Sequence, residues 1–142
     1  MTPAFWDSSS LVPLCIRQSS TPVAHSLSNQ YEMSVWWAAP VEVRGAFARL
    51  ARMGQLSGTD QVEAQVRFER LRGGWKEVGP SPDLRDRAEH LVDRFPLKAA
   101  DALQLAAAMA CCSGRPAGRA FISGDTQLLV AARQLGFLAI DA

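Results

Sequence analysis

Short apolar segments alternate with longer segments of helical spacing along this chain, and this alternation limits its fold more than any other feature. The segments that predict strands are 3–6 (PAFW), 32–37 (EMSVWW), 119–123 (RAFIS), 137–140 (FLAI) and, more weakly, 75–81 (WKEVGPS). Strands that alternate with helices favour an α/β fold, with a mostly parallel central sheet flanked by helices on both faces. We expect residues 1–142 to form a single domain.

Helices are expected between these strands, at 9–17, 22–30, 40–54, 57–74, 81–95, 98–112 and 126–135. Pro22 suits the first position of its helix, while Gly54 and Gly136 are natural stops for theirs. Pro13 is compatible with its helix only in or near the first turn, because proline lacks the N–H that later turns need. The segment 98–112 is apolar on almost every side, which predicts a buried helix.

Composition excludes several classes of protein. Hydrophobic residues make up 48% of the chain and charged residues 20%, as in ordinary soluble globular domains. No apolar run is long enough to span a membrane, and the N-terminus does not resemble a secretory signal. The cysteines (Cys15, Cys111 and Cys112) fit small buried residues in a reducing cytoplasm. His25 and His90 lack the spacing of zinc ligands.

Two aspartates follow predicted strands. Asp7 comes after PAFW, and Asp125 comes after RAFIS and one glycine. Ligands bind beyond the carboxyl ends of the strands in sheets of this kind. Aspartate is also a favoured N-cap, so either residue taken alone suits a cap on the helix that follows.

Two further acids lie on predicted helices. Glu42 is near the start of its helix, and the face it shares with Gly45, Ala46 and Arg49 is small beside the acid. Such a face would admit a substrate backbone. Asp101 lies within LKAADALQLAAAM, where a buried carboxylate needs compensation. The alternatives to a functional role are a cap on a helix starting at 102 or a salt bridge to Lys98.

The four acids together indicate a metal site. If Asp7, Glu42, Asp101 and Asp125 converge, their mutual repulsion calls for a divalent cation. An all-oxygen ligand set suits Mg²⁺ or Mn²⁺, which bind a few carboxylates plus water and substrate phosphates.

Four segments carry a family resemblance that covers essentially the whole chain. FWDSSSLV (5–12), APVEVRGAFARL (39–50), LKAADALQLAAAM (97–109) and FISGDTQLLVAARQLGF (121–137) resemble, in order and spacing, the acidic motifs of PIN-domain ribonucleases. The greatest likeness is to the VapC-type toxins of bacterial toxin–antitoxin pairs. The resemblance implies that the four acids bind the metal, with Ser8 and Ser123 as supporting hydroxyls. Gln104 departs from the histidine that many members carry there.

The resemblance also implies partners. The substrate would be RNA, and a cognate antitoxin would occupy the acidic groove with a basic side chain. Self-association is expected too, as a homodimer or as a hetero-oligomer with the antitoxin. Bulky residues offer candidate contacts for these partners: Trp36, Trp37, Phe47, Leu50, Met53, Val66 and Phe68. For most of them singly, a place in the core is the simpler interpretation.

Basic residues offer candidate contacts to the RNA backbone. Arg44 and Arg49 are the leading substrate-binding candidates, and the wider set adds Arg52, Arg67, Arg70, Arg72 and Lys76. Solvated helix faces remain the simpler interpretation for any one of these side chains.

Two other functions fit parts of the sequence. SGDTQLLVAARQLGF resembles the Gly-Asp motif of haloacid-dehalogenase-like phosphatases, with Asp7 as nucleophile. Those enzymes carry a second aspartate two residues later and a further acid downstream, where this chain has Ser9 and Leu129. The remaining alternative is a non-catalytic binding module on the same fold, in which the acids serve as caps and salt bridges.

Overall fold

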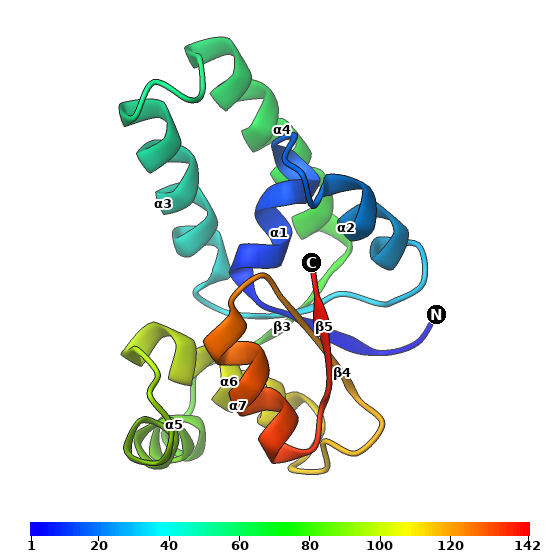
Figure 1. The fold of residues 1–142 in the computed structure, drawn as a ribbon, viewed down its shortest axis with the longest axis vertical. Coiled ribbons are helices and arrows are strands. Elements are labelled where there is room, and N and C mark those ends of the chain that lie inside the picture. The colour runs from blue at the N-terminus through cyan, green and yellow to red at the C-terminus, as the bar shows by residue number, and fades with distance from the viewer.

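Five parallel strands form the central layer of the computed structural model, which describes residues 1–142 (Figure 1). The strands are β1 (Ala4–Trp6), β2 (Ser34–Trp36), β3 (Lys76–Val78), β4 (Ala120–Ser123) and β5 (Leu138–Asp141), in the spatial order β3-β2-β1-β4-β5. Because β1 is central and every pairing is parallel, the carboxyl ends of all strands lie at one edge of the sheet. The predicted α/β class and its parallel sheet are confirmed.

Seven helices cover both faces of the sheet. They are α1 (Ser8–Cys15), α2 (Thr21–Ser28), α3 (Ala39–Arg52), α4 (Gly58–Gly74), α5 (Pro82–Arg94), α6 (Ala99–Cys111) and α7 (Thr126–Leu135). Each predicted helix and strand is present, with ends shifted by a few residues. None of the helices is both long and apolar enough to cross a membrane.

Strand alternation divides the core into two clusters. Side chains of successive strand residues point to opposite faces, so Phe5 packs with α5, α6 and α7, while Trp6 packs with α1 to α4. Figure 1 shows the two groups of helices on opposite sides of the sheet. The Ala-rich helix α6 is buried along most of its length, as its composition predicts.

The helices α3 and α4 form a hairpin that projects from the sheet (Figure 1). Phe47 of α3 meets Phe68 of α4 edge to face, with ring centroids 6.4 Å apart, and both side chains are fully buried. The chain leaves α3 through Gly54, whose φ of 74° is the left-handed conformation that glycine adopts without strain. The hairpin forms one wall of the site described below.

Two local expectations were wrong. Pro13 lies well inside α1 rather than in its first turn. The helix tolerates it because it ends two residues later, and because Leu11, Leu14 and other side chains of α1 are buried. Cys111 is exposed, whereas Cys15 and Cys112 are buried as expected.

Candidate active site

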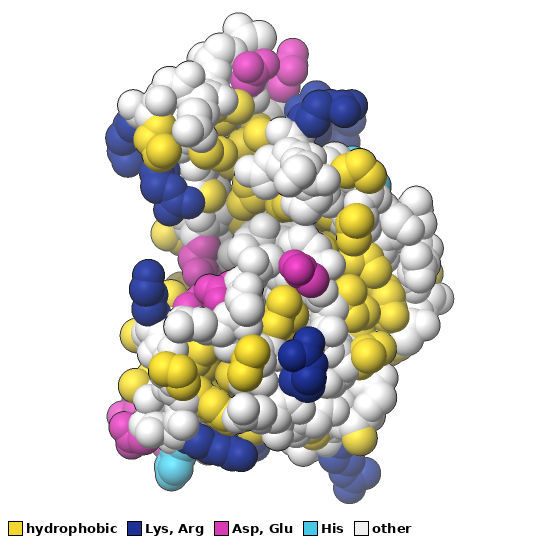
Figure 2. Space-filling model, in the orientation of Figure 1, with side chains coloured by type: hydrophobic (Ala, Val, Ile, Leu, Met, Phe, Trp, Pro, Cys, Tyr) yellow, Lys and Arg dark blue, Asp and Glu magenta, His cyan; other side chains and the backbone are white.

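Four carboxylates from four separate elements line one pocket of about 180 Å³. Asp7 follows β1, Glu42 lies in the first turn of α3, Asp101 lies in the first turn of α6, and Asp125 follows β4. The pocket therefore lies beyond the carboxyl ends of β1 and its neighbour β4, where α/β sheets bind ligands. Figure 2 shows acidic side chains inside a hollow between the α3–α4 hairpin and the lower half of the molecule.

Asp7 lines the pocket and does not cap its helix. It occupies the N-cap position of α1, yet its side chain makes no capping hydrogen bond. Its Oδ2 instead accepts hydrogen bonds from Ser9 Oγ and from Ser123 Oγ, the latter at 2.8 Å. Burial raises the pKa of Asp7, and the two serine hydroxyls lower it. Its carboxylate is thus fixed by hydroxyls from both α1 and β4.

Asp125 caps its helix and also lines the pocket. Its Oδ1 accepts a hydrogen bond of 3.1 Å from the backbone N–H of Leu128, which caps α7, and its side chain also lines the pocket. Gly124 precedes it, and a Cβ at residue 124 would make a tight contact of 3.0 Å with the carbonyl oxygen of Ala142. The Gly124 N–H donates to Ser9 Oγ at 3.0 Å, which ties this turn to α1.

Glu42 faces the pocket together with the small face predicted for α3. Ala46 and Arg49, one and two turns further along, line the same pocket. Burial raises the pKa of Glu42, and the charges of Asp7 and Asp101 raise it further. Gln104 Nε2 donates to Glu42 Oε1 at 2.8 Å and lowers that pKa.

Asp101 is neither a helix cap nor the partner of a salt bridge with Lys98, the two alternatives to a functional role. Helix α6 begins at Ala99, so Asp101 cannot cap it, and Lys98 forms no ion pair with Asp101. The pKa of Asp101 is raised to about 6, mainly by burial and then by the charges of Asp125 and Asp7. The charge of Lys98 lowers the pKa of Asp101 in part. The carboxylate is held among like charges, and Lys98 compensates it only from beyond ion-pair distance.

The basic residues considered as RNA-backbone contacts differ in whether they reach the acidic pocket. Arg49 lines the acidic pocket. Arg44 points elsewhere, since it pairs with Glu69 at 3.3 Å and lines a different groove with Val62 and Val66. Three more of the candidates also pair with carboxylates, namely Arg67, Arg72 and Lys76. Arg49 is thus the basic side chain that the structure brings to the four acids.

The bulky residues proposed as partner contacts differ in their exposure to solvent. Trp37, Met53 and Val66 expose 55%, 59% and 49% of their surface, so they are available to a partner. Trp36, Phe47 and Phe68 are buried and belong to the core, which corrects their inclusion among the contact candidates.

Gln104 contacts two residues of the pocket, and the sequence identified it only as a departure from the resembling family. It lies on α6 one turn after Asp101, is fully buried, and reaches both Ser8 and Glu42. The available signal was its spacing: a polar amide three residues after an acid, on an otherwise apolar helix, lies on the face of that acid.

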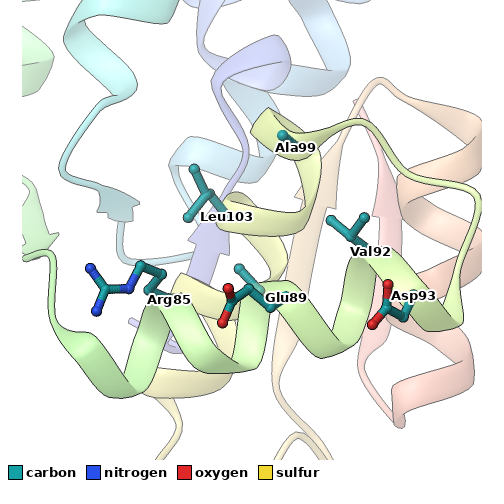
Figure 3. Close-up of a pocket in the computed structure, with 7 residues that line it drawn as sticks. Arg85, Glu89, Val92, Asp93, Ala99 and Leu103 are labelled. Carbon is teal, nitrogen blue, oxygen red and sulfur yellow. The ribbon is translucent and has the colours of Figure 1, made fainter.

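A larger hollow of about 420 Å³ lies between α5 and α6, away from these acids. Figure 3 shows Arg85, Glu89, Val92 and Asp93 along α5, with Ala99 and Leu103 on α6 above them. Its ionisable side chains all come from a single helix. No acid of the four-carboxylate pocket lines it.

The strand order, the helices on both faces and the four acids around one edge define a PIN-like α/β domain. No protein-family model and no curated protein sequence matches the chain. Solved structures do. PAE2754 from Pyrobaculum aerophilum aligns with a TM-score of 0.70 over 99% of this chain and 83% of that one, at 18% identity.

Two further solved structures have the same fold. VapBC2 from Rickettsia felis, bound to a DNA fragment from its promoter, aligns with a TM-score of 0.67 over 99% of this chain and all (100%) of that one, at 10% identity. A toxin–antitoxin complex from Klebsiella pneumoniae aligns with a TM-score of 0.61 over 87% and 88%, at 18% identity. The predicted PIN-like fold is confirmed by these likenesses.

Proposed function

We propose that this chain is a Mg²⁺- or Mn²⁺-dependent endoribonuclease and the toxin of a toxin–antitoxin pair. The observation that carries the proposal is the convergence of Asp7, Glu42, Asp101 and Asp125 on one pocket at the carboxyl edge of the sheet. The pKa values of the first three are raised by burial, and those of Glu42 and Asp101 also by neighbouring carboxylates. Keeping such neighbouring carboxylates ionised costs free energy unless a bound cation neutralises their charge.

The donor set fits a hard divalent cation, because all four candidate ligands are carboxylates. No three of the side chains meet closely enough to hold an ion as they stand. We therefore expect small side-chain movements when the ion binds. Ser123 orients Asp7, and Ser8 donates to Glu42 at 3.3 Å. When bound, the cation would activate water and stabilise the charge that develops on the attacked phosphate.

Arg49 supplies positive charge at the rim of the same pocket. We expect its guanidinium to bind an RNA phosphate next to the scissile bond, since arginine matches phosphate geometry with paired hydrogen bonds. In-line attack by water leaves a 5′-phosphate and a 3′-hydroxyl. Mapping the product ends tests this chemistry, and a 2′,3′-cyclic phosphate would refute it. Sequencing the 5′ ends of cellular RNA after brief expression of wild type and Asp7→Ala would identify the target.

The phosphatase alternative is not favoured. Its second aspartate would stand at position 9, where Ser9 is committed to hydrogen bonds with Asp7 and Gly124. Its downstream acid would stand at position 129, where Leu129 is buried in the core. A covalent aspartyl-phosphate on Asp7 would revive this alternative.

A non-catalytic binding module is distinguished by metal binding. An acidic cluster that holds a cation should give a protein whose melting temperature rises with Mn²⁺, since a ligand that binds only the folded state stabilises it. Asp7→Asn should abolish that rise, while Asp93→Asn on the exposed side of α5 should retain it. No response to Mn²⁺ in the wild type would support the binding module.

The partner that we propose is an antitoxin that places a basic side chain among the carboxylates. The fold is shared with a protein solved as a toxin–antitoxin complex, and the exposed Trp37, Met53 and Val66 offer apolar contact. The neighbouring reading frame should encode a short protein with a basic, amphipathic C-terminal half. Co-expression should suppress RNA cleavage and yield a co-purifying complex. Absence of such a neighbour, together with no growth arrest on expression, would indicate a free-standing nuclease.

A further inference from the structure

Both hydrogen bonds of the Gln104 side chain go to residues of the acidic site. Its Nε2 donates to Ser8 Oγ at 2.7 Å and to Glu42 Oε1 at 2.8 Å. Ser8 Oγ in turn donates to the same Glu42 oxygen at 3.3 Å. The three side chains come from α6, α1 and α3, so this small network joins three of the elements that build the pocket.

This arrangement is costly for the fold. Gln104 is fully buried, and its Oε1 has no hydrogen-bond partner. A buried polar atom left without a partner costs about 1–3 kcal/mol. Its neighbours on α6 include Leu105, Ala107 and Ala108, all buried and apolar. A leucine or methionine at position 104 would pack there without the unpaired oxygen, so core packing does not account for the amide.

What the amide adds is a pair of donors that carry no charge. A lysine or arginine at this position would neutralise the acids and compete with a cation for them. An amide donates hydrogen bonds while leaving the negative charge of Glu42 available. Hydrogen bonds of this type orient the side chains that bind a metal, and their loss commonly weakens metal affinity or activity by about 10- to 100-fold.

We propose that Gln104 is a positioning residue that fixes the Glu42 carboxylate, directly and through Ser8, in the orientation that binds the divalent cation. The inference rests on the metal-dependent function proposed above. It assigns Gln104 a function of its own at a position where the resembling ribonucleases often carry a different residue. Burial raises the pKa of Glu42, and the hydrogen bonds from Gln104 and Ser8 oppose that rise, which supports the same assignment.

The test compares Gln104→Leu with Leu105→Met, a buried change of similar size on the same helix. Mn²⁺ affinity is measured by titration calorimetry on chelator-treated protein, and the melting temperature of the metal-free protein is measured alongside. We expect Gln104→Leu to bind Mn²⁺ about 10- to 100-fold more weakly. Its metal-free melting temperature should not fall, because the unpaired Oε1 is removed and Glu42 stays open to water in the pocket. Leu105→Met should retain wild-type affinity.

A double-mutant cycle with Ser8→Ala adds a second readout. Because Gln104 and Ser8 act on the same Glu42 oxygen, their effects on Mn²⁺ affinity should be strongly non-additive. RNA cleavage by Gln104→Leu should recover toward the wild-type rate at saturating Mn²⁺. Gln104→Met repeats the comparison if the leucine variant is poorly folded.

Three results would overturn the inference. Wild-type Mn²⁺ affinity in Gln104→Leu would show that the amide does not position Glu42. A fall in the metal-free melting temperature in both Gln104→Leu and Gln104→Met, but not in Leu105→Met, would assign Gln104 to the fold instead. A wild-type protein that neither binds Mn²⁺ nor cleaves RNA would overturn the proposed function itself, which distinguishes the two failures.

Discussion

Replacing Asp101 with asparagine should stabilise the metal-free protein above neutral pH. The pKa of Asp101 is raised from 3.8 to about 6 by burial and by the charges of Asp125 and Asp7. Each pKa unit corresponds to about 1.36 kcal/mol, so the upper limit for the destabilisation by ionised Asp101 is about 3 kcal/mol. Because Asp101 is part-exposed and solvent screens it, we expect about 1–2 kcal/mol.

The sign of the pH dependence follows from linkage. A carboxyl group whose pKa is higher in the folded state binds its proton more tightly there, so wild-type stability is lost as pH rises from 3.8 toward 6. Below that window Asp101 is protonated in both states, and the neutral amide of the variant should bring no advantage. Above it the penalty is complete, and Asp101→Asn should show its full gain.

Urea unfolding at a series of pH values between about 3 and 8, in the presence of a chelator, measures this difference. Asp93→Asn on the exposed side of α5 controls for the loss of one negative charge. A loss of stability in Asp101→Asn at the alkaline end of the series would refute the reasoning and would instead support an ion pair with Lys98. A gain of equal size at both ends of the series would show that packing, rather than charge, is responsible.

Three further predictions concern the other site residues. Asp125→Ala removes the α7 cap, so chemical denaturation should show a loss of about 1 kcal/mol in the free energy of unfolding. Asp125→Asn should keep the cap and its stability, and cleavage assays should show that it loses only activity. Single alanine substitutions of the four carboxylates should each reduce RNA cleavage strongly; an active Asp7→Ala or Glu42→Ala would contradict the metal site. Arg49→Ala should lower kcat/KM about 10- to 100-fold, the worth of a hydrogen bond to a charged group, and Arg44→Ala should leave it near wild type. Equal effects of the two arginine changes would remove Arg49 from the site.

Local sequence patterns predicted the elements of this fold well. The spacing of apolar residues identifies strands and helices, and glycines and prolines mark where they begin and end. The carboxyl ends of parallel strands share one edge, so the positions of Asp7 and Asp125 after their strands are enough to place the two acids at the same edge. Helical spacing then relates Glu42 to Ala46 and Arg49 on one face of α3.

What the sequence could not supply were contacts between distant elements. Glu69 forms an ion pair with Arg44 because α3 and α4 pack side by side. The spacing of the two residues in the sequence does not indicate that packing. The pairing of Phe47 with Phe68 is hidden for the same reason, so both residues resembled candidates for a partner surface. Gln104 gains its importance from Ser8, which is far away in the sequence.

The strand order also determines when, during synthesis, the four-carboxylate pocket becomes complete. β1 emerges first, but one of its two neighbours is β4, the strand that brings Ser123 and Asp125. A nascent chain that has reached only α6 carries three of the acids, while β1 still has an open edge and Asp7 lacks one of its two serine donors. Ribosomes extend chains at about 5–20 residues per second, so this incomplete state precedes every finished molecule. Any fragment that terminates before β4 inserts beside β1 should therefore lack the proposed nuclease activity, so it should not cleave the message from which it is being translated.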